Sequence, residues 1–489
     1  MNSRSLFSIC LIYFVFTYPV CSQVEKYNLG DIISMAQGES PQVKIEKVRL
    51  SNAFWRLQSF KADLKPRINL NATLPNLNRT IDEVVLPTGA SQYLNRSQMN
   101  NNLGINLSQS ISATGGTVFA ATGLSRLDIF KTNTTDANFS YRGQPFYLGF
   151  SQPISGYNTW KWDKQLRPLE FEASKKIFSE NKENIASQAV ALYFDLLLSQ
   201  LELNAISKLK SSSDTLYLLN KSRFEVGKIA ETELLQSEIN LMNTDVSVAQ
   251  SKLQVSTANE RLRNFLGLQR NVEFELVAPD AIPEFIVTAE DAIDRARKNR
   301  SEFINQTISK LNAESNLDRA KRNKEISFNG TIGFTQTGKT VAEALSKPLD
   351  QEIIFLGINM PIADWGKTKA RTEIAKSNLE LVNMNNEQER TNFEQEIRLK
   401  VNQIQLKKDG VKIAQRANEA SNKRFDLSTQ RYLIGKISIT ELNQAIEDQN
   451  KSRQAYFNAL RDFWVSYYEI RRLTLYDFIE KKELVHDQK

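Results

Sequence analysis

The sequence predicts an α+β membrane protein: a long α-helical coiled-coil barrel continuous with a transmembrane β-barrel, built from two tandem structural repeats. Three observations predict this fold class. Two distant segments recur at one fixed spacing. Helical stretches of about 60 residues carry a seven-residue apolar pattern. Short strands alternate between one apolar and one polar face.

The repeat is clearest in a segment rich in charged residues. Residues 223–236 (RFEVGKIAETELLQ) recur at 431–444 (RYLIGKISITELNQ), with eight of 14 positions identical and a spacing of 431 − 223 = 208 residues. The same spacing places Leu148–Ile154 on Leu356–Ile362. One spacing that serves two distant segments indicates a two-copy architecture.

The front parts of the two copies match at a spacing of 260, so the first copy holds 260 − 208 = 52 additional residues between Leu74 and Tyr147. We therefore expect a first repeat at 23–272, a second at 273–478 and a charged C-terminal tail at 479–489 that is mobile.

Composition excludes several classes of chemistry. The 489 residues include one histidine, His486, and two cysteines, Cys10 and Cys21. Disulfide frameworks, Cys/His zinc sites and thiol nucleophiles are therefore not expected after residue 22. We predict no catalytic residues, no cofactor and no metal ligands.

Residues 1–22 predict a secretory signal peptide. One basic residue precedes an apolar run that is too short to span a bilayer, and the segment Val20-Cys21-Ser22 resembles a small-residue cleavage site. Alternatively, Tyr18–Cys21 could be a poor lipobox that leaves Cys21 acylated. No later run of 18 residues is apolar throughout, so no membrane-spanning helix is expected.

Each repeat has the order helix, strand, loop, strand, very long helix, glycine break, long helix. Helices are expected at 29–65 with a break at Ser40-Pro41, and at 160–220, 230–266, 289–324, 367–430 and 439–472. The longest would extend about 90 Å at 1.5 Å per residue.

These helices carry heptad seams. An apolar seam runs from Leu234 to Leu262, and a seam of mostly small residues runs from Ser237 to Phe265, each with a period of seven. A third stripe consists of Ile239, Val246 and Leu253. The seams fit an isolated antiparallel helical hairpin or a closed ring of helices, and the period alone does not decide between them.

The predicted strands help to decide between an isolated helical hairpin and a larger assembly. Apolar residues alternate with small or polar residues in four segments, 67–74, 146–151, 326–335 and 354–360. A soluble sandwich alternates similarly, but four strands neither cover both faces of a sandwich nor close a barrel with a polar interior. Strands from several copies of the chain, joined in one membrane barrel, remove both difficulties.

With these features, the sequence resembles the TolC-type outer-membrane channel family over essentially the whole mature chain. The resemblance rests on the tandem halves, on the strand-ending Pro153-Ile154 and Pro361-Ile362, and on the paired Gly-x-x-x-x-Thr-Glu-Leu segments. It implies a homotrimer with a 12-stranded outer-membrane barrel, four strands per chain, and a helical barrel in the periplasm of a Gram-negative bacterium. It also implies an exit duct in contact with outer-membrane lipid, served by an inner-membrane pump and a periplasmic adaptor, with no nucleic-acid partner.

The resemblance assigns roles to two glycine turns. It implies that Gly227 and Gly435 lie at the periplasmic tips of the helical hairpins, where an adaptor docks. The neighbouring tip residues are Lys228, Thr232, Lys436 and Thr440. A reversing helix needs a residue that tolerates φ > 0, so the glycines could also serve the turn alone.

The resemblance also implies a periplasmic aperture lined by Glu441 and Gln444. Three copies of Glu441 would form a negative ring that favours cations. Gln444 departs from a second acidic ring, and Ile437 stands where the family can place a basic residue that locks the tip. Without this context, Glu441 is a solvated helix residue.

The 52-residue insertion is a further departure from the family. Leu103, Ile105 and Leu107 alternate, Thr114-Gly115-Gly116 predicts a turn, and 117–124 could form another strand. The hairpin could lengthen the strands, cover the outside or raise the strand count. We expect four barrel strands per chain with an appended hairpin.

Three functions compete. The first is a passive outer-membrane exit duct of a tripartite efflux or type I secretion system. The second is a periplasmic coiled-coil adaptor or scaffold without a pore, which leaves the embedded strands unexplained. The third is an exported carboxylate enzyme such as a glycosidase. The sequence identifies neither the transported substrate nor the class of pump.

Overall fold

The computed structural model describes residues 26–85, 89–132, 136–268, 272–279, 282–322, 324–434 and 436–484. The predicted signal peptide, Cys10, Cys21, Gly435 and His486 lie outside the described residues, so the cleavage and acylation alternatives stay predictions.

The long helices of the two repeats begin and end at corresponding positions. Helices α3 (Thr159–Glu225) and α8 (Lys367–Leu433) have 67 residues each, and α4 (Glu231–Leu266) and α9 (Ile439–Thr474) have 36 each. In each pair, the first residues of the two helices lie 208 positions apart and so do the last residues, which is the spacing found in the sequence. At 1.5 Å per residue, α3 and α8 are each about 100 Å long.

The front helices repeat at the second spacing. Helices α1 (Leu29–Glu39) and α5 (Ala289–Asn299) have 11 residues each and begin 260 residues apart. Their N-caps also correspond: the Asn28 side chain accepts from the backbone N–H of Asp31, and the Thr288 side chain from that of Asp291. Helices α2 (Pro41–Asp63) and α6 (Glu302–Lys321) follow.

One expected helix is divided. The sequence predicted a single helix over 289–324, but the structure breaks it between α5 and α6 at Arg300 and Ser301. The first repeat signals the corresponding break with Pro41, whereas the second repeat has no proline there. Instead, a buried ion pair holds the break, with Arg300 Nη1 2.9 Å from Glu180 Oε2.

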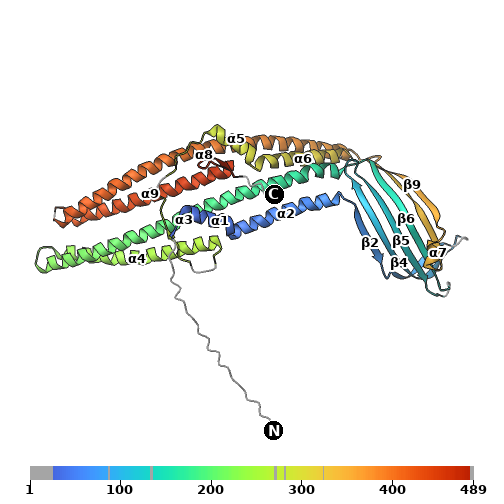
Figure 1. The fold of residues 1–489 in the computed structure, drawn as a ribbon, viewed down its shortest axis with the longest axis horizontal. Helices are drawn as coiled ribbons and strands as arrows, with labels where there is room; N and C mark the ends of the chain where they lie inside the picture. Colours follow the sequence, from blue (N-terminus) through green and yellow to red (C-terminus); the bar gives the residue numbers. More distant parts are fainter. Residues whose placement is uncertain are drawn as a thin grey trace, which may run out of the picture. The chain divides into compact units, whose positions relative to one another are not determined.

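Seven of the described strands form one large antiparallel sheet (Figure 1). Its order is β2-β4-β5-β6-β8-β9, and β3 pairs with the N-terminal part of β4, from Ser91 to Met99. The bounds are β2 Arg67–Thr73, β3 Leu77–Val85, β4 Ser91–Ile111, β5 Gly116–Ile129, β6 Asn138–Ser155, β8 Glu325–Gly338 and β9 Leu349–Asn359. A short helix, α7 (Val341–Leu345), joins β8 to β9.

The inserted hairpin is part of this sheet. Strands β4 and β5 lie between β2 and β6, so the expectation of four strands with an appended hairpin is wrong for the sheet of one chain. The physical reason is the strand pairing: β2 pairs with β4 along its whole length, from Arg67 opposite Ser108 to Thr73 opposite Asn102.

The chain divides into two compact units that do not coincide with the repeats. One comprises residues 1–41, 185–283 and 408–465, and the other 42–184, 284–407 and 466–489. The first holds α1, α4, most of α9 and the two-stranded pairing of β1 (Lys26–Tyr27) with β7 (Glu275–Leu276). The second holds the sheet and the C-terminus.

Buried side chains of α3 form much of the core of the first unit. Ala189, Val190, Tyr193, Phe194 and Leu196 are each 0% exposed. Among the described helices, α3 is the one that is long and apolar enough to cross a membrane by length and composition. Its most apolar 18-residue window has a mean hydropathy of 1.3, and 33% of this window is buried. This property is weak evidence of a membrane span, because a helix in the core of a soluble protein meets the same criterion.

The C-terminal segment packs against the rest of its unit beyond residue 479, where a mobile tail was expected to begin. Strand β10 (Tyr476–Asp477) pairs with β11 (Lys482–Glu483), and Leu484 is buried. Lys298 Nζ lies 2.8 Å from Glu483 Oε1. The prediction of a mobile tail from residue 479 is therefore wrong as far as residue 484, and residues 485–489 lie outside the described part.

Candidate functional site

The first predicted tip is a helix end closed by a left-handed glycine. Gly227 has φ +70°, and no heavy atom lies within 4 Å of a Cβ built on it. Its N–H donates to Phe224 O at 2.8 Å, and the Lys228 N–H donates to Arg223 O at 2.8 Å. This pair of bonds is a Schellman motif, which satisfies the last carbonyls of α3.

The surface around this turn is open. Lys228 and Thr232 are exposed, and Val226 is 67% exposed. Helix α4 has two acidic residues, Glu231 and Glu233, in its first turn. Their negative charges interact favourably with the partial positive charge of the helix N-terminus. An approaching protein would therefore meet backbone, exposed apolar side chains such as Val226, and charges of both signs.

The second tip repeats one of these hydrogen bonds. The Lys436 N–H donates to Arg431 O at 2.9 Å, 208 residues after the bond from Lys228 to Arg223. Lys436 and Thr440 are exposed. The predicted turn residue Gly435 lies outside the described residues.

Ser438 fixes the start of α9 and with it the predicted aperture residue. Its Oγ accepts from the Glu441 N–H at 3.2 Å, which is an N-cap bond. The Glu441 side chain is exposed in the first helical turn. It shares a groove with basic residues of α8, and the lining residues are Ala420, Lys423, Arg424, Leu427, Ser428, Arg431, Ile437 and Glu441.

Two residues that the sequence reasoning missed join this site. Gln444 Nε2 donates to Asp448 Oδ1 at 2.9 Å, and Arg424 Nη1 lies 2.5 Å from Asp448 Oδ2. The structure thus places Glu441, Gln444 and Asp448 on the hairpin of α8 and α9 together with Arg424. Helical spacing could have found Asp448, which is seven residues after Glu441 and four after Gln444.

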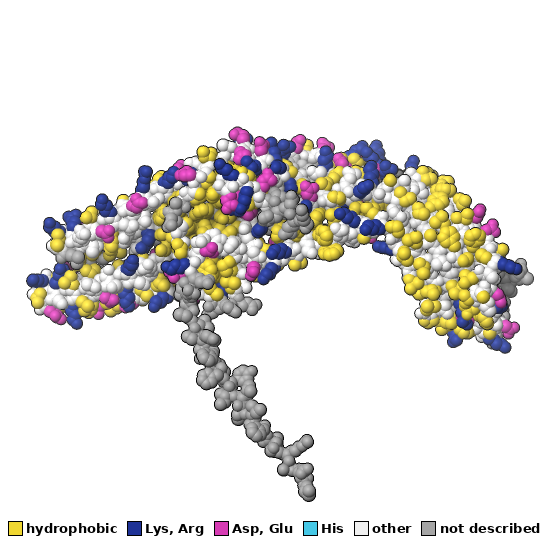
Figure 2. Space-filling model, viewed as in Figure 1, with side chains coloured by type: hydrophobic (Ala, Val, Ile, Leu, Met, Phe, Trp, Pro, Cys, Tyr) yellow, Lys and Arg dark blue, Asp and Glu magenta, His cyan; other side chains and the backbone are white. Residues whose placement is uncertain are grey.

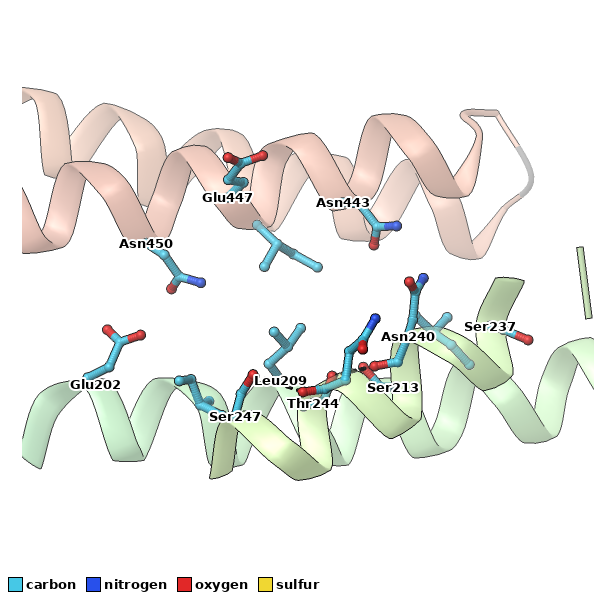
Figure 3. A pocket seen from close by; sticks show the side chains of 14 residues that line it. Glu202, Leu209, Ser213, Ser237, Asn240, Thr244, Ser247, Asn443, Glu447 and Asn450 are labelled. Carbon is cyan, nitrogen blue, oxygen red and sulfur yellow. Dashed lines mark hydrogen bonds between the residues drawn. The ribbon is translucent and has the colours of Figure 1, made fainter. Parts of the chain in front are cut away.

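A cavity of about 450 Å³, lined by both polar and apolar side chains, lies further along the same unit (Figure 3). Residues of α3, α4 and α9 line it, and in Figure 3 Asn450 and Glu202 point toward one another across the space. Glu202 also accepts a hydrogen bond from Gln454 at 3.2 Å. Within the described ranges, no three His, Cys, Asp or Glu side chains are grouped to hold a metal ion.

Seams predicted from the heptads have different environments. The small seam is buried at Ser237, Thr244, Ser251 and Ala258. The third stripe is exposed, with Ile239 at 51%, Val246 at 58% and Leu253 at 69%. One chain therefore uses the small seam for its own packing and leaves an apolar stripe of α4 uncovered.

Comparison with solved structures shows the fold. The chain is similar to the Campylobacter jejuni CmeC outer membrane channel, with a TM-score of 0.68, 17% identity and coverage of 93% of this chain and 87% of that one. It is also similar to the open state of the Neisseria gonorrhoeae MtrE outer membrane channel, with a TM-score of 0.61, 12% identity and coverage of 93% and 90%. For the Vibrio cholerae outer membrane protein VceC, the TM-score is 0.57 and the identity 12%, with coverage of 91% of this chain and 96% of that one.

Comparison with curated protein sequences gives no match. The model of the outer membrane efflux protein family matches residues 121–268 and 292–474, which is more than half of the chain and includes both long helical hairpins. This match confirms the duct and disfavours the adaptor and the exported enzyme. The chain is an exit duct of the outer membrane with its helical part in the periplasm, and it belongs to the outer membrane efflux protein family.

Proposed function

We propose that three copies of the chain form one passive duct, which receives substrates from an inner-membrane pump through a periplasmic adaptor. The observation that carries the proposal is the open sheet. Strands β2 and β9 are its two edges, and each leaves a row of backbone N–H and C=O groups unpaired within one chain. Such groups must be paired in lipid, so β9 of one copy would pair with β2 of the next.

The uncovered apolar stripe of α4 supports the same assembly. Ile239, Val246 and Leu253 follow one another at seven-residue spacing and are all more than half exposed. A helix of a neighbouring copy would cover this stripe in a ring of helices. A single chain would leave it in contact with water.

Adaptor docking at the tips is proposed from their exposure and open turn geometry. Replacing Lys228 or Lys436 by Glu would reverse a charge at each tip without disturbing a buried contact, because both side chains are exposed. We expect weaker association with the cognate adaptor, measured by co-purification from cross-linked cells. Lys221→Glu, at an exposed position within α3, is the matched control. Equal recovery of adaptor for all three variants would exclude docking at these lysines.

We further propose that Glu441 lines the narrowest periplasmic passage. Each Glu441 is exposed in the first turn of α9, and three copies around an axis would form a negative ring. The test is single-channel conductance of detergent-extracted protein in planar bilayers. Glu441→Ala should reduce the preference for cations.

Glu233 provides the matched control for this test. It stands 441 − 233 = 208 residues before Glu441, in the first turn of α4, and is also exposed. Glu233→Ala removes the same charge from the other hairpin and should leave selectivity near that of the wild type. Equal loss in both variants would assign selectivity to the general charge of the tips. If neither the wild type nor either variant conducts, the result would contradict a duct.

A further inference from the structure

We propose that the inserted hairpin β4–β5 is part of the lipid-facing wall, so that each subunit contributes six strand positions to the barrel. Strands β2 and β3 together occupy one position, because both pair with β4 on the same edge. The other positions are β4, β5, β6, β8 and β9. With the homotrimer proposed above, on which this total rests, the barrel has 18 strands in place of the 12 that the resemblance implies.

The side chains of the inserted strands continue the faces of the neighbouring strands. Register places Leu70 opposite Ile105 on β4, Leu107 of β4 opposite Ala120 of β5, and Ala120 opposite Leu148 of β6. Because directly opposite residues share a face of the sheet, one face is apolar from β2 across the insertion to β6. The sheet is mostly hydrophobic on the side seen in Figure 2.

Exposure is similar on inserted and original strands of this face. Leu103 and Ile105 are each 46% exposed, as compared with 50% for Phe146 and 42% for Leu148. A hairpin that covered the outside of the barrel would expose these side chains to water, which is unfavourable for a contiguous apolar surface. Contact with lipid accounts for both sets.

The opposite face is polar on both sides of the junction. Asn69 lies opposite Asn106, and Thr73 lies opposite Asn102. The sheet therefore alternates between apolar and polar faces on β2 and β4 alike, which is the pattern of a membrane barrel with a wet interior.

The turn of the hairpin lies at the end of the sheet where α3 begins. Residues 112–115 form this turn, and Asn158, just before α3, donates from Nδ2 to Ser112 O at 3.1 Å. Gln152 of β6 binds it as well, with Thr114 Oγ1 donating to Gln152 Oε1 at 2.8 Å. Because α3 continues into the periplasm, the hairpin has a short periplasmic turn, as membrane barrels do. A cover on the outer side would not reach Asn158.

The consequence is a wider outer part of the duct. At equal strand tilt, barrel diameter grows roughly in proportion to strand number, so 18 strands give about 1.5 times the diameter of 12. Barrels of 16–18 strands leave an aqueous channel. The barrel would then admit larger substrates than a 12-stranded wall, and the helical aperture would set the size limit.

Disulfide trapping decides between the two strand orders. The sequence has no cysteine after residue 21, so engineered pairs are free of background in the mature chain. In the six-position wall, Asn69→Cys with Asn106→Cys and Leu70→Cys with Ile105→Cys join directly opposite residues of β2 and β4. The two pairs cover both kinds of antiparallel position.

The repeat supplies the competing pair. Strands β8 and β9 place Asn329 opposite Phe355, and the spacings of 260 and 208 convert these to Asn69 and Tyr147. A four-strand arrangement with β2 directly beside β6 would therefore cross-link Asn69→Cys with Tyr147→Cys. Ser151→Cys with Asn329→Cys joins β6 to β8 in either arrangement and reports correct assembly.

We expect the β2–β4 pairs and the β6–β8 control to form intrachain disulfides in outer-membrane extracts, and the Asn69–Tyr147 pair to stay reduced. The reverse pattern overturns the six-position wall. Single-cysteine variants supply a second readout: Asn106→Cys should react with a membrane-impermeant maleimide, and Ile105→Cys should not. Reaction of both would overturn the lipid-facing position.

Native mass spectrometry of the extracted duct tests the copy number separately. A mass of three chains supports 18 strands. Another number of chains overturns the proposed trimer and the total of 18, whereas the disulfides alone decide the six positions per subunit.

Discussion

Phe119 of the inserted strand β5 lies directly opposite Gly149 of β6, in a space that only a glycine leaves open. A Cβ built at Gly149 would lie 2.6 Å from Phe119 Cε2 and 2.8 Å from Thr331 Cγ2. The ring also contacts Tyr147 edge to face, with 6.2 Å between centroids. The insertion is thus fitted to the original sheet by packing as well as by hydrogen bonds.

This fit predicts the effect of a side chain at position 149. Gly149→Val should force Phe119 out of its place and destabilise the assembled barrel by about 1–3 kcal/mol, the usual effect of overpacking. Thermal unfolding of the detergent-solubilised protein measures the change. The double variant Gly149→Val/Phe119→Ala should recover part of the loss, because the smaller side chain leaves room. Additive losses would contradict the contact.

A second prediction concerns the conformation of the first tip. Gly227→Ala places a side chain at φ +70°, so we expect a local cost of about 1–2 kcal/mol, although no atom obstructs the new Cβ. Hydrogen exchange of the Lys228 amide, which closes the turn on Arg223, should become faster by about 5- to 30-fold.

Gly410 is the matched control for Gly227. It also has no heavy atom within 4 Å of a built Cβ, but it lies inside α8 with ordinary helical geometry. Gly410→Ala should stabilise the helix locally by about 0.5–1 kcal/mol. Similar effects of the two substitutions would show that backbone conformation does not distinguish the tip.

Periodicity predicted the long helices well because their pattern is local. The repeat at 208 residues anticipated the bounds of α3 with α8 and of α4 with α9, and the alternating segments became β2, β6, β8 and β9. The break at Arg300 was not predictable in this way, since its partner Glu180 is 120 residues away. The position of β4 between β2 and β6 was also hidden, because alternation identifies the face of a strand but not its neighbours.

At the aperture, the sequence found the residues but not their partners. Glu441 and Gln444 followed from the resemblance, and the structure adds the bond from Gln444 to Asp448 and the ion pair of Asp448 with Arg424. Arg424 lies on α8 and Asp448 on α9, so only the packing of the two helices brings them together.

A third prediction concerns the ion pair at the break between α5 and α6. Burial lowers the pKa of Arg300, while the attraction of Glu180 opposes this effect. Glu180 Oε1 also accepts from the Ser301 N–H at 2.8 Å. Arg300→Met would leave a largely buried carboxylate, 12% exposed, without its partner and should destabilise the protein by about 3–5 kcal/mol in thermal unfolding.

The corresponding control removes the charge of both partners. In Arg300→Met/Glu180→Gln, the amide oxygen still accepts from Ser301 and no unpaired charge stays buried. We expect this double variant to be more stable than Arg300→Met alone. Equal stability of the two would mean that the lost packing of Arg300 against Phe393, 5.5 Å from ring centroid to guanidinium carbon, dominates.

The last prediction is a pH dependence of the C-terminal segment. Burial raises the pKa of Asp477, but hydrogen bonds and the charge of Arg471 outweigh burial and lower the pKa below its ordinary value. Tyr467 Oη donates to Asp477 Oδ1 at 2.6 Å, the N–H groups of Ile479 and Glu480 donate to the same oxygen at 2.9 Å, and Arg471 Nη1 lies 2.9 Å from Oδ2.

Because the folded pKa of Asp477 is depressed, its stabilising contribution is complete above the ordinary pKa of an aspartate, about 3.9, and is lost as the pH falls through the folded value. The protection factors of the amides in the segment 475–484, which are corrected for the change of intrinsic exchange rate with pH, should therefore fall below about pH 4. Asp477→Asn should destabilise the segment at neutral pH by about 1–3 kcal/mol and remove much of this acid dependence. Glu483→Gln removes the exposed ion pair with Lys298, which solvent screens, and should therefore change the acid dependence much less than Asp477→Asn. Parallel acid profiles for the wild type and Asp477→Asn would show that other carboxylates hold the segment.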